Sequence, residues 1–435
     1  MEWMSLSDGF KKGIERDMVV MQVVKRGVWR SSVWGDEVTL EYGKALRGYS
    51  QKKGTYRVFG SNGPIGWTSE ALTQGPGVVL GRKGAYRGVE FCRDPFWVID
   101  TAYYIVPKTD LDMRWLYYAV KYYKLGEVDD GSPIPSTTRA AVYMLELDVP
   151  PKHEQRAIAH ILGTLDDKIE LNRKQNETLE AMARAMFKAW FVDFEPVRAK
   201  MEGRWKRGQS LPGMPAHLYD LFPDRMVESE FGEIPEGWEV GNFTDIVDIV
   251  GGGTPKTSVS EYWGGGIPWF SVVDTPVSSD VFVTNTERSI TKLGLIDSSA
   301  RLVEQGTTII SARGTVGNLA IAGVDMAFNQ SCYALQARQG CWKYFVFLSA
   351  RRLVEQLKAM SHGSVFSTIT RQTFMAVRLV LPPIKLVCEF ERCSSAIFVN
   401  ILNNVEMSRS LGVQRDVLIP YLVSGRLRVS AELND

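Results

Sequence analysis

Basic side chains are concentrated in two stretches of the chain, one in each half. Between Lys44 and Arg93 nine basic residues stand against two acidic ones, a net charge of +7, and between Arg301 and Arg378 nine stand against three, a net charge of +6. A stretch of this charge attracts a polyanion such as DNA or RNA. The alternative is chance, since the whole chain has a net charge of only +1. Charge alone leaves nucleic-acid binding open.

Residue types that read DNA bases lie in both halves. Arg and Lys donate to guanine, Asn and Gln pair with adenine, and Ser or Thr position phosphates. Flanking glycines such as Gly60 and Gly84 let the backbone approach a ligand closely. In the first half, the candidates for DNA contact are Lys52, Lys53, Arg57, Ser61, Asn62, Arg82, Lys83, Tyr86, Arg87 and Arg139. In the second half, they are Lys256, Thr257, Trp269, Ser271, Asp274, Arg313, Thr315 and Arg371. For each candidate the alternative is an ordinary solvated or structural side chain.

The sequence motifs of catalysis are missing. An amino-methyltransferase needs an Asn/Asp-Pro-Pro-Tyr/Phe loop, but the Pro-Pro pairs here read Val-Pro-Pro-Lys and Leu-Pro-Pro-Ile. The sequence also has no GxxxxGK[ST] phosphate loop. His153 and His160 lie seven positions apart on a predicted helix, which favours a helix face over a metal or acid-base site. We therefore expect this chain to have no catalytic residue, no metal site and no cofactor of its own.

The chain contains an internal duplication. When the sequence is shifted along itself, 131–139 (GSPIPSTTR) aligns with 363–371 (GSVFSTITR), and the same shift aligns the first Pro-Pro pair with the second. A shift shorter by two positions aligns the strand-like 78–84 with 308–314. Two long copies are too few for a solenoid, so the pattern predicts a duplicated module with pseudo-twofold symmetry. Arg139 and Arg371 hold matching positions, where they contact DNA or cap a turn.

Each copy ends in a segment with helical periodicity. From Ile158 to Trp190 seam positions alternate spacings of four and three, and the longer shift carries them onto the same alternation from Ile397 to Leu422. This is the seam of a coiled coil, with polar pairs that fix its register, so we expect the two helices to pair. The alternative is two independent helices, each packed on its own domain. A helix of about 37 residues is roughly 55 Å long, near the length of 16 base pairs of DNA.

Several motifs resemble those of one known family. The segments 150–156 (PPKHEQR), 165–173, 176–179 and 187–194 resemble the central conserved region of specificity subunits of type I restriction-modification enzymes. Segments 232–238, 311–315, 415–420 and 422–425 resemble other parts of these subunits, in the family's order. The resemblance spans about Trp29 to Leu427. The chain departs from the family at 383–388, where the usual Glu-Gln is missing at the start of the second helix.

The resemblance implies a non-catalytic subunit with two target-recognition domains, each reading one half of a split double-stranded DNA sequence. It implies two modification (methyltransferase) subunits as partners, which methylate adenine N6 with S-adenosylmethionine. Two restriction (translocase and nuclease) subunits that use ATP and Mg²⁺ complete the assembly. Side chains at the ends of the long helices would dock the methyltransferase, with core packing as the alternative: Trp190, Phe191, Phe194, Tyr421 and Leu422.

Length and composition set the domain organisation. The 435 residues, 45% hydrophobic and 23% charged, are typical of a soluble protein with more than one domain. The sequence has neither a bilayer-spanning apolar run nor a signal peptide, and its five cysteines form no CxxC pair, so we expect a cytoplasmic protein. We predict a mixed α/β fold with two recognition domains separated by two long antiparallel helices. The predicted divisions are 1–150 (recognition domain), 151–195 (central helix), 196–235 (irregular linker), 236–383 (second recognition domain) and 384–435 (distal helix and tail).

Two other functions are open at this point. The chain would be a self-contained DNA-modifying enzyme if it turned over S-adenosylmethionine alone. It would be a coiled-coil scaffold without nucleic-acid binding if it showed no salt-dependent affinity for duplex DNA.

Overall fold

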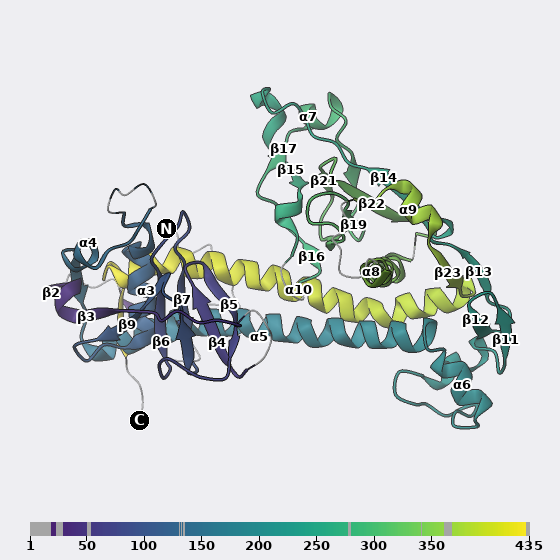
Figure 1. Ribbon diagram of the computed structural model, residues 1–435, viewed down its shortest axis with the longest axis horizontal. Coiled ribbons are helices and arrows are strands. Elements are labelled where there is room, and N and C mark those ends of the chain that lie inside the picture. Colours follow the sequence, from purple (N-terminus) through teal and green to yellow (C-terminus); the bar gives the residue numbers. More distant parts are fainter. Residues whose placement is uncertain are drawn as a thin grey trace. The chain divides into compact units, whose positions relative to one another are not determined.

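The computed structural model shows a mixed α/β protein that divides into two compact units (Figure 1). It describes residues 19–22, 29–49, 54–129, 131, 133, 135–276, 280–340, 342–360 and 368–431. Unit 1 contains residues 1–168 and 410–435, and unit 2 contains residues 169–409. The boundary between the units crosses two long helices, α5 (Lys152–Phe191) and α10 (Ile384–Val423).

Unit 1 is built on an antiparallel sheet with the strand order β3-β9-β6-β7 and a smaller sheet with the order β5-β4-β8. The central strand β6, Gly-Val-Val-Leu-Gly, is buried throughout, as expected for an apolar β-branched run inside a sheet. The strands are β1 (Val19–Gln22), β2 (Arg30–Val33), β3 (Val38–Tyr42), β4 (Tyr56–Gly60), β5 (Gly63–Thr68), β6 (Gly77–Gly81), β7 (Val89–Cys92), β8 (Phe96–Val98), β9 (Ala102–Pro107), β10 (Glu146–Val149) and β24 (Arg428–Ala431). The short helices are α2 (Trp34–Glu37), α3 (Met113–Tyr122), the 3-10 helix η2 (Leu125–Glu127) and α4 (Arg139–Tyr143).

Unit 2 repeats this architecture. Its main sheet has the order β14-β22-β19-β20-β16, and a second sheet has the order β17-β15-β21-β18. The strands are β11 (Met226–Ser229), β12 (Gly232–Pro235), β13 (Glu239–Asn242), β14 (Val247–Gly251), β15 (Trp263–Phe270), β16 (Phe282–Val283), β17 (Ser289–Ile290), β18 (Leu302–Val303), β19 (Thr308–Ser311), β20 (Leu319–Ala322), β21 (Met326–Phe328), β22 (Cys332–Ala337) and β23 (Arg378–Leu381). The helices are α6 (Glu195–Met201), η3 (Ala216–Leu221), η4 (Phe243–Asp245), η5 (Ser260–Tyr262), η6 (Val272–Asp274), α7 (Lys292–Ile296), α8 (Lys343–Met360) and α9 (Arg371–Ala376).

The duplication predicted from the sequence is confirmed by the strand register. The order β3-β9-β6-β7 of unit 1 recurs as β14-β22-β19-β20 in unit 2, with every neighbouring pair antiparallel. The shorter shift of the sequence repeat relates the start of β9 to that of β22 and the start of α3 to that of α8, and the longer shift relates β10 to β23. The bridge from β2 to β10 also recurs, because Val33 faces Glu146 and Asn242 faces Arg378. These registers make each position of unit 1 comparable with one position of unit 2.

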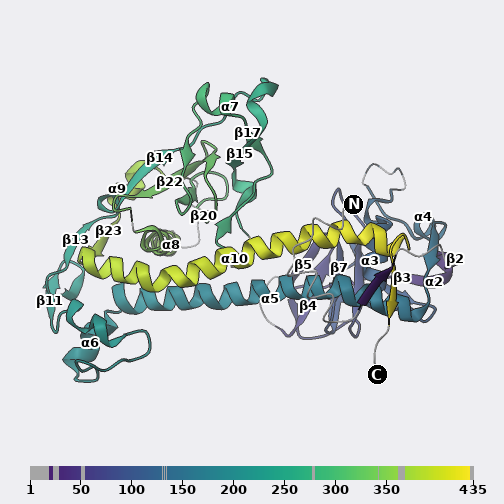
Figure 2. The same cartoon turned by 180° about the vertical axis from the view of Figure 1, so that it is seen from behind.

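The long helices form the antiparallel pair that their seams predict. α5 and α10 are both 40 residues long, and each starts directly after a Pro-Pro pair, at positions related by the longer shift. α10 therefore starts at the repeat position even without the Glu-Gln. Figures 1 and 2 show α5 in teal beside α10 in yellow. In unit 2 the buried Asn172 donates to Ser408 at 3.1 Å, and Asn404 donates to Asn176 at 2.9 Å.

The segment predicted as an irregular linker has more structure than expected. Residues 196–235 contain most of α6, the 3-10 helix η3 and the hairpin β11–β12. Trp205 is 1% exposed and Leu218 is 0% exposed, and both belong to the main hydrophobic core of unit 2. Their burial explains the order, since apolar area removed from water offsets the entropy of fixing the chain.

Within the part of the chain that the structure describes, no helix is both long enough and apolar enough to cross a membrane.

Candidate nucleic-acid interface

Loop 82–88 connects β6 to β7 in unit 1 and presents an exposed lysine. At its base the Gly81 amide donates to the Gly88 carbonyl at 2.8 Å. Lys83 forms a β-bridge with Ser136, which belongs to the first copy of the repeated Gly-Ser motif. The structure thus joins two segments that the sequence analysis singled out separately. The Lys83 side chain is exposed at this junction.

Loop 312–318 is its equivalent in unit 2, between β19 and β20. The Ser311 amide donates to the Asn318 carbonyl at 2.9 Å, as Gly81 does to Gly88. Arg313 forms a β-bridge with Thr368, the residue that the longer shift aligns with the bridge partner of Lys83. The Arg313 side chain is exposed, like that of Lys83.

Both loops use glycine at the turn beside the basic residue. Gly84 has φ of 106° and Gly314 has φ of 75°, left-handed values that favour glycine. The backbone hydrogen bonds at the base of each loop are also equivalent: the Thr137 amide donates to Arg82, and the Ile369 amide donates to Ala312, both at 2.9 Å. Each unit therefore holds one exposed cation on a loop of the same construction.

Arg82 and Arg139 flank one tyrosine in unit 1. Their guanidinium carbons lie 4.9 and 4.2 Å from the ring centroid of Tyr42, which is 45% exposed. Arg139 also donates to the Leu40 carbonyl at 2.6 Å. Cation–π contacts of this kind fix side chains in place. The sequence gives no signal for Tyr42, because the residues of this cluster are distant along the chain.

Other candidates in unit 1 are engaged with the protein itself. Arg87 donates to three backbone carbonyls, of Gly84, Gly126 and Val128, so it holds the loop. Arg57 stacks on Trp67 at 4.5 Å. The Ser61 hydroxyl donates to the Thr101 carbonyl at 2.6 Å. These hydrogen bonds favour the structural alternative for Arg87 and Ser61.

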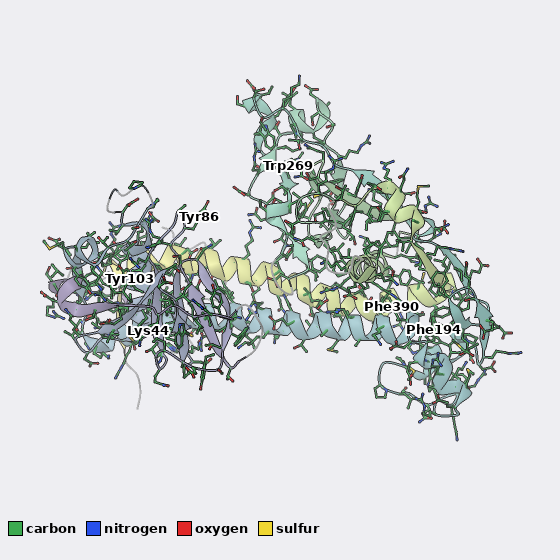
Figure 3. All side chains as sticks on the ribbon, viewed as in Figure 1. Lys44, Tyr86, Tyr103, Phe194, Trp269 and Phe390 are labelled. Atoms are coloured by element: carbon green, nitrogen blue, oxygen red, sulfur yellow. The ribbon has the colours of Figure 1, made fainter. Side chains whose placement is uncertain are left out.

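Two further candidates in unit 1 face solvent. Asn62 is exposed, and Tyr86 is 78% exposed and points outward from loop 82–88 (Figure 3). Lys52 and Lys53 lie outside the described residues.

In unit 2 the candidates again divide into exposed and engaged residues. Trp269 is only 5% exposed and its indole donates to the Gly253 carbonyl at 3.0 Å, so it supports this backbone and presents no face to a base. Ser271 donates to Asp274 at 2.9 Å, and the pair caps η6. The exposed candidates are Lys256, Thr257, Arg313, Thr315 and Arg371.

A second arginine accompanies Arg371. An open pocket of about 460 Å³ is lined by Arg301, Arg371, two glycines, two serines and an alanine. Arg301 begins the second basic stretch of the sequence, but only the fold brings it beside Arg371. Two guanidinium groups beside small residues suit a phosphate or the edge of a base.

The comparisons with known proteins agree with this architecture. A match to the family described as the type I restriction modification DNA specificity domain covers residues 23–181 and 235–386, more than half of the chain. The chain belongs to this family. The resemblance inferred from the sequence motifs is therefore confirmed, and each of the two matched regions includes one recognition sheet and the start of one long helix.

Relatives within the specificity family match most of the chain. The type I restriction enzyme HindI specificity subunit of Haemophilus influenzae is 28% identical over 343 residues, 71% of this chain and 74% of that protein. The MjaIX specificity subunit of Methanocaldococcus jannaschii is 26% identical over 335 residues, 75% of this chain and 71% of that protein. A crystal structure of a type I restriction-modification S subunit from M. genitalium shares the fold, with a TM-score of 0.55 at 15% identity, over 92% of this chain and 97% of that one.

The docking residues expected from the specificity-family resemblance are mostly buried. Trp190, Phe191 and Phe194 are 1%, 5% and 8% exposed and pack in the core of unit 2, and Leu422 is 0% exposed in the core of unit 1. Their burial favours the core-packing alternative for these four residues. Tyr421 is 38% exposed.

Within the described residues, no group of three or more His, Cys, Asp or Glu side chains is placed to hold a metal ion.

Proposed function

We propose that this chain is the DNA-specificity subunit of a type I restriction-modification complex and binds a bipartite double-stranded DNA target, with one half-site for each unit. The observation that carries this proposal is the pair of equivalent loops, which present Lys83 and Arg313 at the same position of two duplicated sheets. Equivalent anchoring with different side chains suits two modules that dock alike and read different bases.

Readout would follow the chemistry of the exposed side chains. Arg313 and Lys83 can donate to guanine O6 and N7 in the major groove, and Asn62 can pair with adenine. Arg301 and Arg371 would add contacts to phosphates or base edges. The engaged residues Arg87 and Trp269 would hold these loops in position without touching DNA.

Partner subunits would catalyse the methylation and cleavage of DNA. Two modification subunits would methylate adenine N6 with S-adenosylmethionine, and two restriction subunits would translocate and cleave with ATP and Mg²⁺. The names of the relatives and the missing methyltransferase and phosphate-loop motifs support this division of labour. We propose that the chain itself is non-catalytic, binds no cofactor and works in the cytoplasm.

Methylome sequencing tests the proposal directly. In a host that carries the cognate modification subunit, exchange of residues 29–150 for those of another family member should change one half of the methylated motif and leave the other half unchanged. Lys83→Ala and Arg313→Ala should each lower methylation about tenfold or more, with relaxed sequence preference in a different half-site. Methylation by the purified chain alone, or a change of both halves after the exchange, would overturn the proposal.

A further inference from the structure

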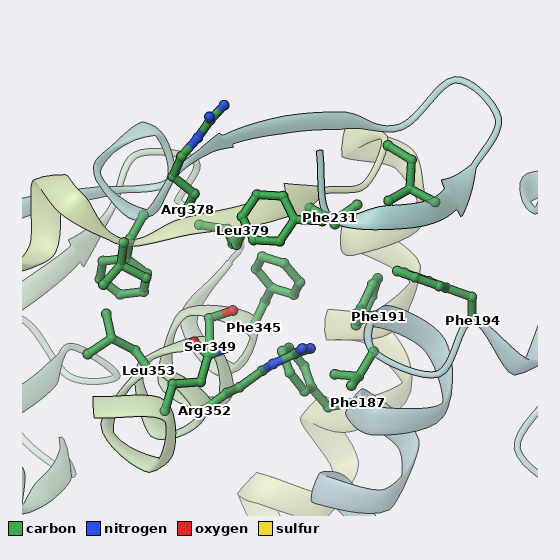
Figure 4. A pocket seen from close by; sticks show the side chains of 16 residues that line it. Phe187, Phe191, Phe194, Phe231, Phe345, Ser349, Arg352, Leu353, Arg378 and Leu379 are labelled. Carbon is green, nitrogen blue, oxygen red and sulfur yellow. The ribbon is translucent and has the colours of Figure 1, made fainter. Parts of the chain in front are cut away.

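A pocket of about 160 Å³ lies within unit 2 beside the C-terminal end of α5 (Figure 4). Its wall is largely apolar and includes the aromatic rings of Phe187 and Phe191 from α5 and of Phe345 from α8. Phe231, at the turn between β11 and β12, also lines it and is 51% exposed. The pocket therefore has a buried aromatic wall and an exposed apolar rim.

Two polar groups of α8 enter this pocket and have no hydrogen-bond partner among the residues that the structure describes. Ser349 is 7% exposed, and its hydroxyl oxygen has no hydrogen-bond partner in the described part of the chain. Arg352 is half-buried and makes no hydrogen bond or ion pair with the described residues; burial lowers its pKa, although the more distant carboxylates of Asp193 and Glu355 oppose this. Figure 4 shows both polar ends directed into the space beside Phe345. An unpaired polar group in such a place costs free energy that a complementary ligand would recover.

The repeat shows what fills the same place in unit 1. The shorter shift, which relates α3 to α8, places Tyr123 at the position equivalent to Leu353. The Tyr123 ring packs edge-on against Trp34 with centroids 5.8 Å apart, and its hydroxyl accepts from the Asp148 amide at 3.2 Å. In unit 2 the position of Trp34 is held by Phe243, by the register of the paired strands.

The equivalents of this tyrosine and both of its neighbours line the open pocket. Leu353, Phe243 and Val380 are all among its lining residues. Unit 2 therefore has open space where unit 1 has a tyrosine ring. The same shift places Tyr122 at the position of Arg352 and an alanine at that of Ser349, so the two polar groups are also specific to unit 2.

We propose that this pocket receives an aromatic side chain with a neighbouring carboxylate, presented by a segment of the modification subunit. The inference rests on the proposed function, which supplies that partner. The aromatic ring takes the space that Tyr123 fills in unit 1. The carboxylate forms an ion pair with Arg352 and accepts a hydrogen bond from the Ser349 hydroxyl. Phe231 covers the rim of the pocket.

Two substitutions in the full-length chain test the pocket through its affinity for the purified modification subunit, measured by calorimetry. Leu353→Tyr places in the pocket the ring found in unit 1. It should weaken binding about 100-fold, because the new ring fills the space that the aromatic side chain of the partner would occupy. Arg352→Gln keeps the length of the side chain, removes its charge, and should weaken binding about 10-fold. Arg378→Gln is the matched control, because Arg378 lines the same pocket but is bound to Glu230 at 2.7 Å. It should change binding about twofold at most.

The outcomes separate this inference from the proposed function. If the modification subunit binds wild type and both pocket variants equally, the pocket inference is wrong while the function stands; if it does not bind wild type at all, the proposed function fails. If thermal unfolding shows that the Leu353→Tyr variant is not folded, the affinity of the Arg352→Gln variant alone tests the inference. A photo-cross-linking amino acid at Phe231 gives an independent readout by mass spectrometry. A cross-linked peptide with Phe, Tyr or Trp next to Asp or Glu supports the inference, and any other product overturns it.

Discussion

The two units attach a long helix to a recognition module through opposite chemistry at equivalent positions. In unit 1, Asp166 of α5 accepts hydrogen bonds from Tyr118 of α3 and from Arg415 of α10, both at 2.6 Å. The next residue, Asp167, accepts from Arg114 at 3.0 Å. Burial and the Asp166 carboxylate raise the pKa of Tyr118, which keeps its hydroxyl a donor. Three elements thus meet on two adjacent carboxylates.

In unit 2 the same joint is aromatic. The residue that the longer shift aligns with Asp166 is Phe398, which is 0% exposed. Its ring stacks on Tyr344 with centroids 4.1 Å apart and planes at 3°, and it contacts Phe347 edge-on at 6.0 Å. Tyr344 stands where unit 1 has Arg114, by the shorter shift. The duplication kept the geometry of the joint and changed the forces that hold it.

The two units also differ in the carboxyl groups whose pKa is most strongly shifted. In unit 1 the hydrogen bond from Arg30 lowers the pKa of Glu37 to about 2 against the effect of burial. Although burial opposes it, Arg114 also keeps the pKa of Asp167 below its usual value. Carboxyl groups with lowered pKa stabilise the fold above their unfolded pKa, and this contribution is lost as the pH falls through the folded pKa. Unit 1 should therefore weaken in acid.

In unit 2 the corresponding effect has the opposite sign. Burial raises the pKa of Glu391 to about 8, although the Phe345 and Tyr344 amides oppose this. A raised pKa stabilises the fold fully below the unfolded pKa of 4.5, and this contribution is lost as the pH rises through about 8. Unit 2 should therefore weaken progressively as the pH rises from about 4.5 to about 8.

The largest effect is expected from Phe398→Ala. Removing a fully buried ring leaves a cavity, which should lower the free energy of unfolding of unit 2 by about 4 kcal/mol. Hydrogen-exchange mass spectrometry would report the loss in peptides of unit 2, and the loss should be the same at low and high salt. A loss that shrinks with salt would show that the joint is not held by apolar burial.

Asp166→Ala should have the next largest effect, in unit 1. The substitution removes one of the two carboxylates that bind Arg415, whose side chain is 18% exposed, and removes the acceptor of the Tyr118 hydroxyl. The free energy of unfolding should fall by about 3 kcal/mol. Added salt should reduce the difference in the free energy of unfolding between this variant and wild type, because screening weakens the ion pair in the wild-type protein. Asp416→Ala is the matched control: Asp416 also binds Arg415, at 2.7 Å, but is 60% exposed, so about 0.5 kcal/mol is expected. Equal losses in the two variants would contradict the assigned role of Asp166.

The comparison between units also shows what sequence can supply. The duplication, the two long helices and the Lys83 and Arg313 loops follow from patterns that are local or recur at fixed spacing. The start of α10 at Ile384 follows the repeat even where the family motif is absent. Such features need no knowledge of which distant residues meet.

Contacts between residues that are distant along the chain cannot be predicted from local sequence patterns. Arg87 is predicted to contact DNA, but its guanidinium group donates to the carbonyls of Gly126 and Val128, which lie far along the chain. Trp269 is buried by residues of other strands. The pocket beside Phe345 depends on a residue that is small relative to its counterpart in the other unit. These properties arise only when distant segments pack.

The caps of two equivalent helices lead to the last prediction. In unit 1 the carboxylate of Asp112 accepts the Arg114 and Trp115 amides at the start of α3. In unit 2 the equivalent residue by the shorter shift is Trp342, which cannot accept. Instead Glu391 of α10 accepts the Phe345 amide at 2.7 Å at the start of α8. The cap has moved from the helix itself to a neighbouring helix, where its carboxyl group is buried.

Glu391→Gln should separate the cap from its charge. The amide oxygen can still accept from Phe345, but the side chain is neutral at every pH, so the variant avoids the cost of ionising a buried carboxyl group. At pH 9 the variant should be more stable than wild type by roughly 2 kcal/mol, and at pH 5 the two should be nearly equal, because wild-type Glu391 is then protonated. Glu389→Gln is the control, since Glu389 is one-third exposed and pairs with Arg392 at 2.8 Å. Urea unfolding followed by tryptophan fluorescence at both pH values decides the matter: a Glu391→Gln chain that is less stable than wild type at pH 9 would mean that the cap depends on the negative charge, and unit 2 would then share the acid sensitivity of unit 1.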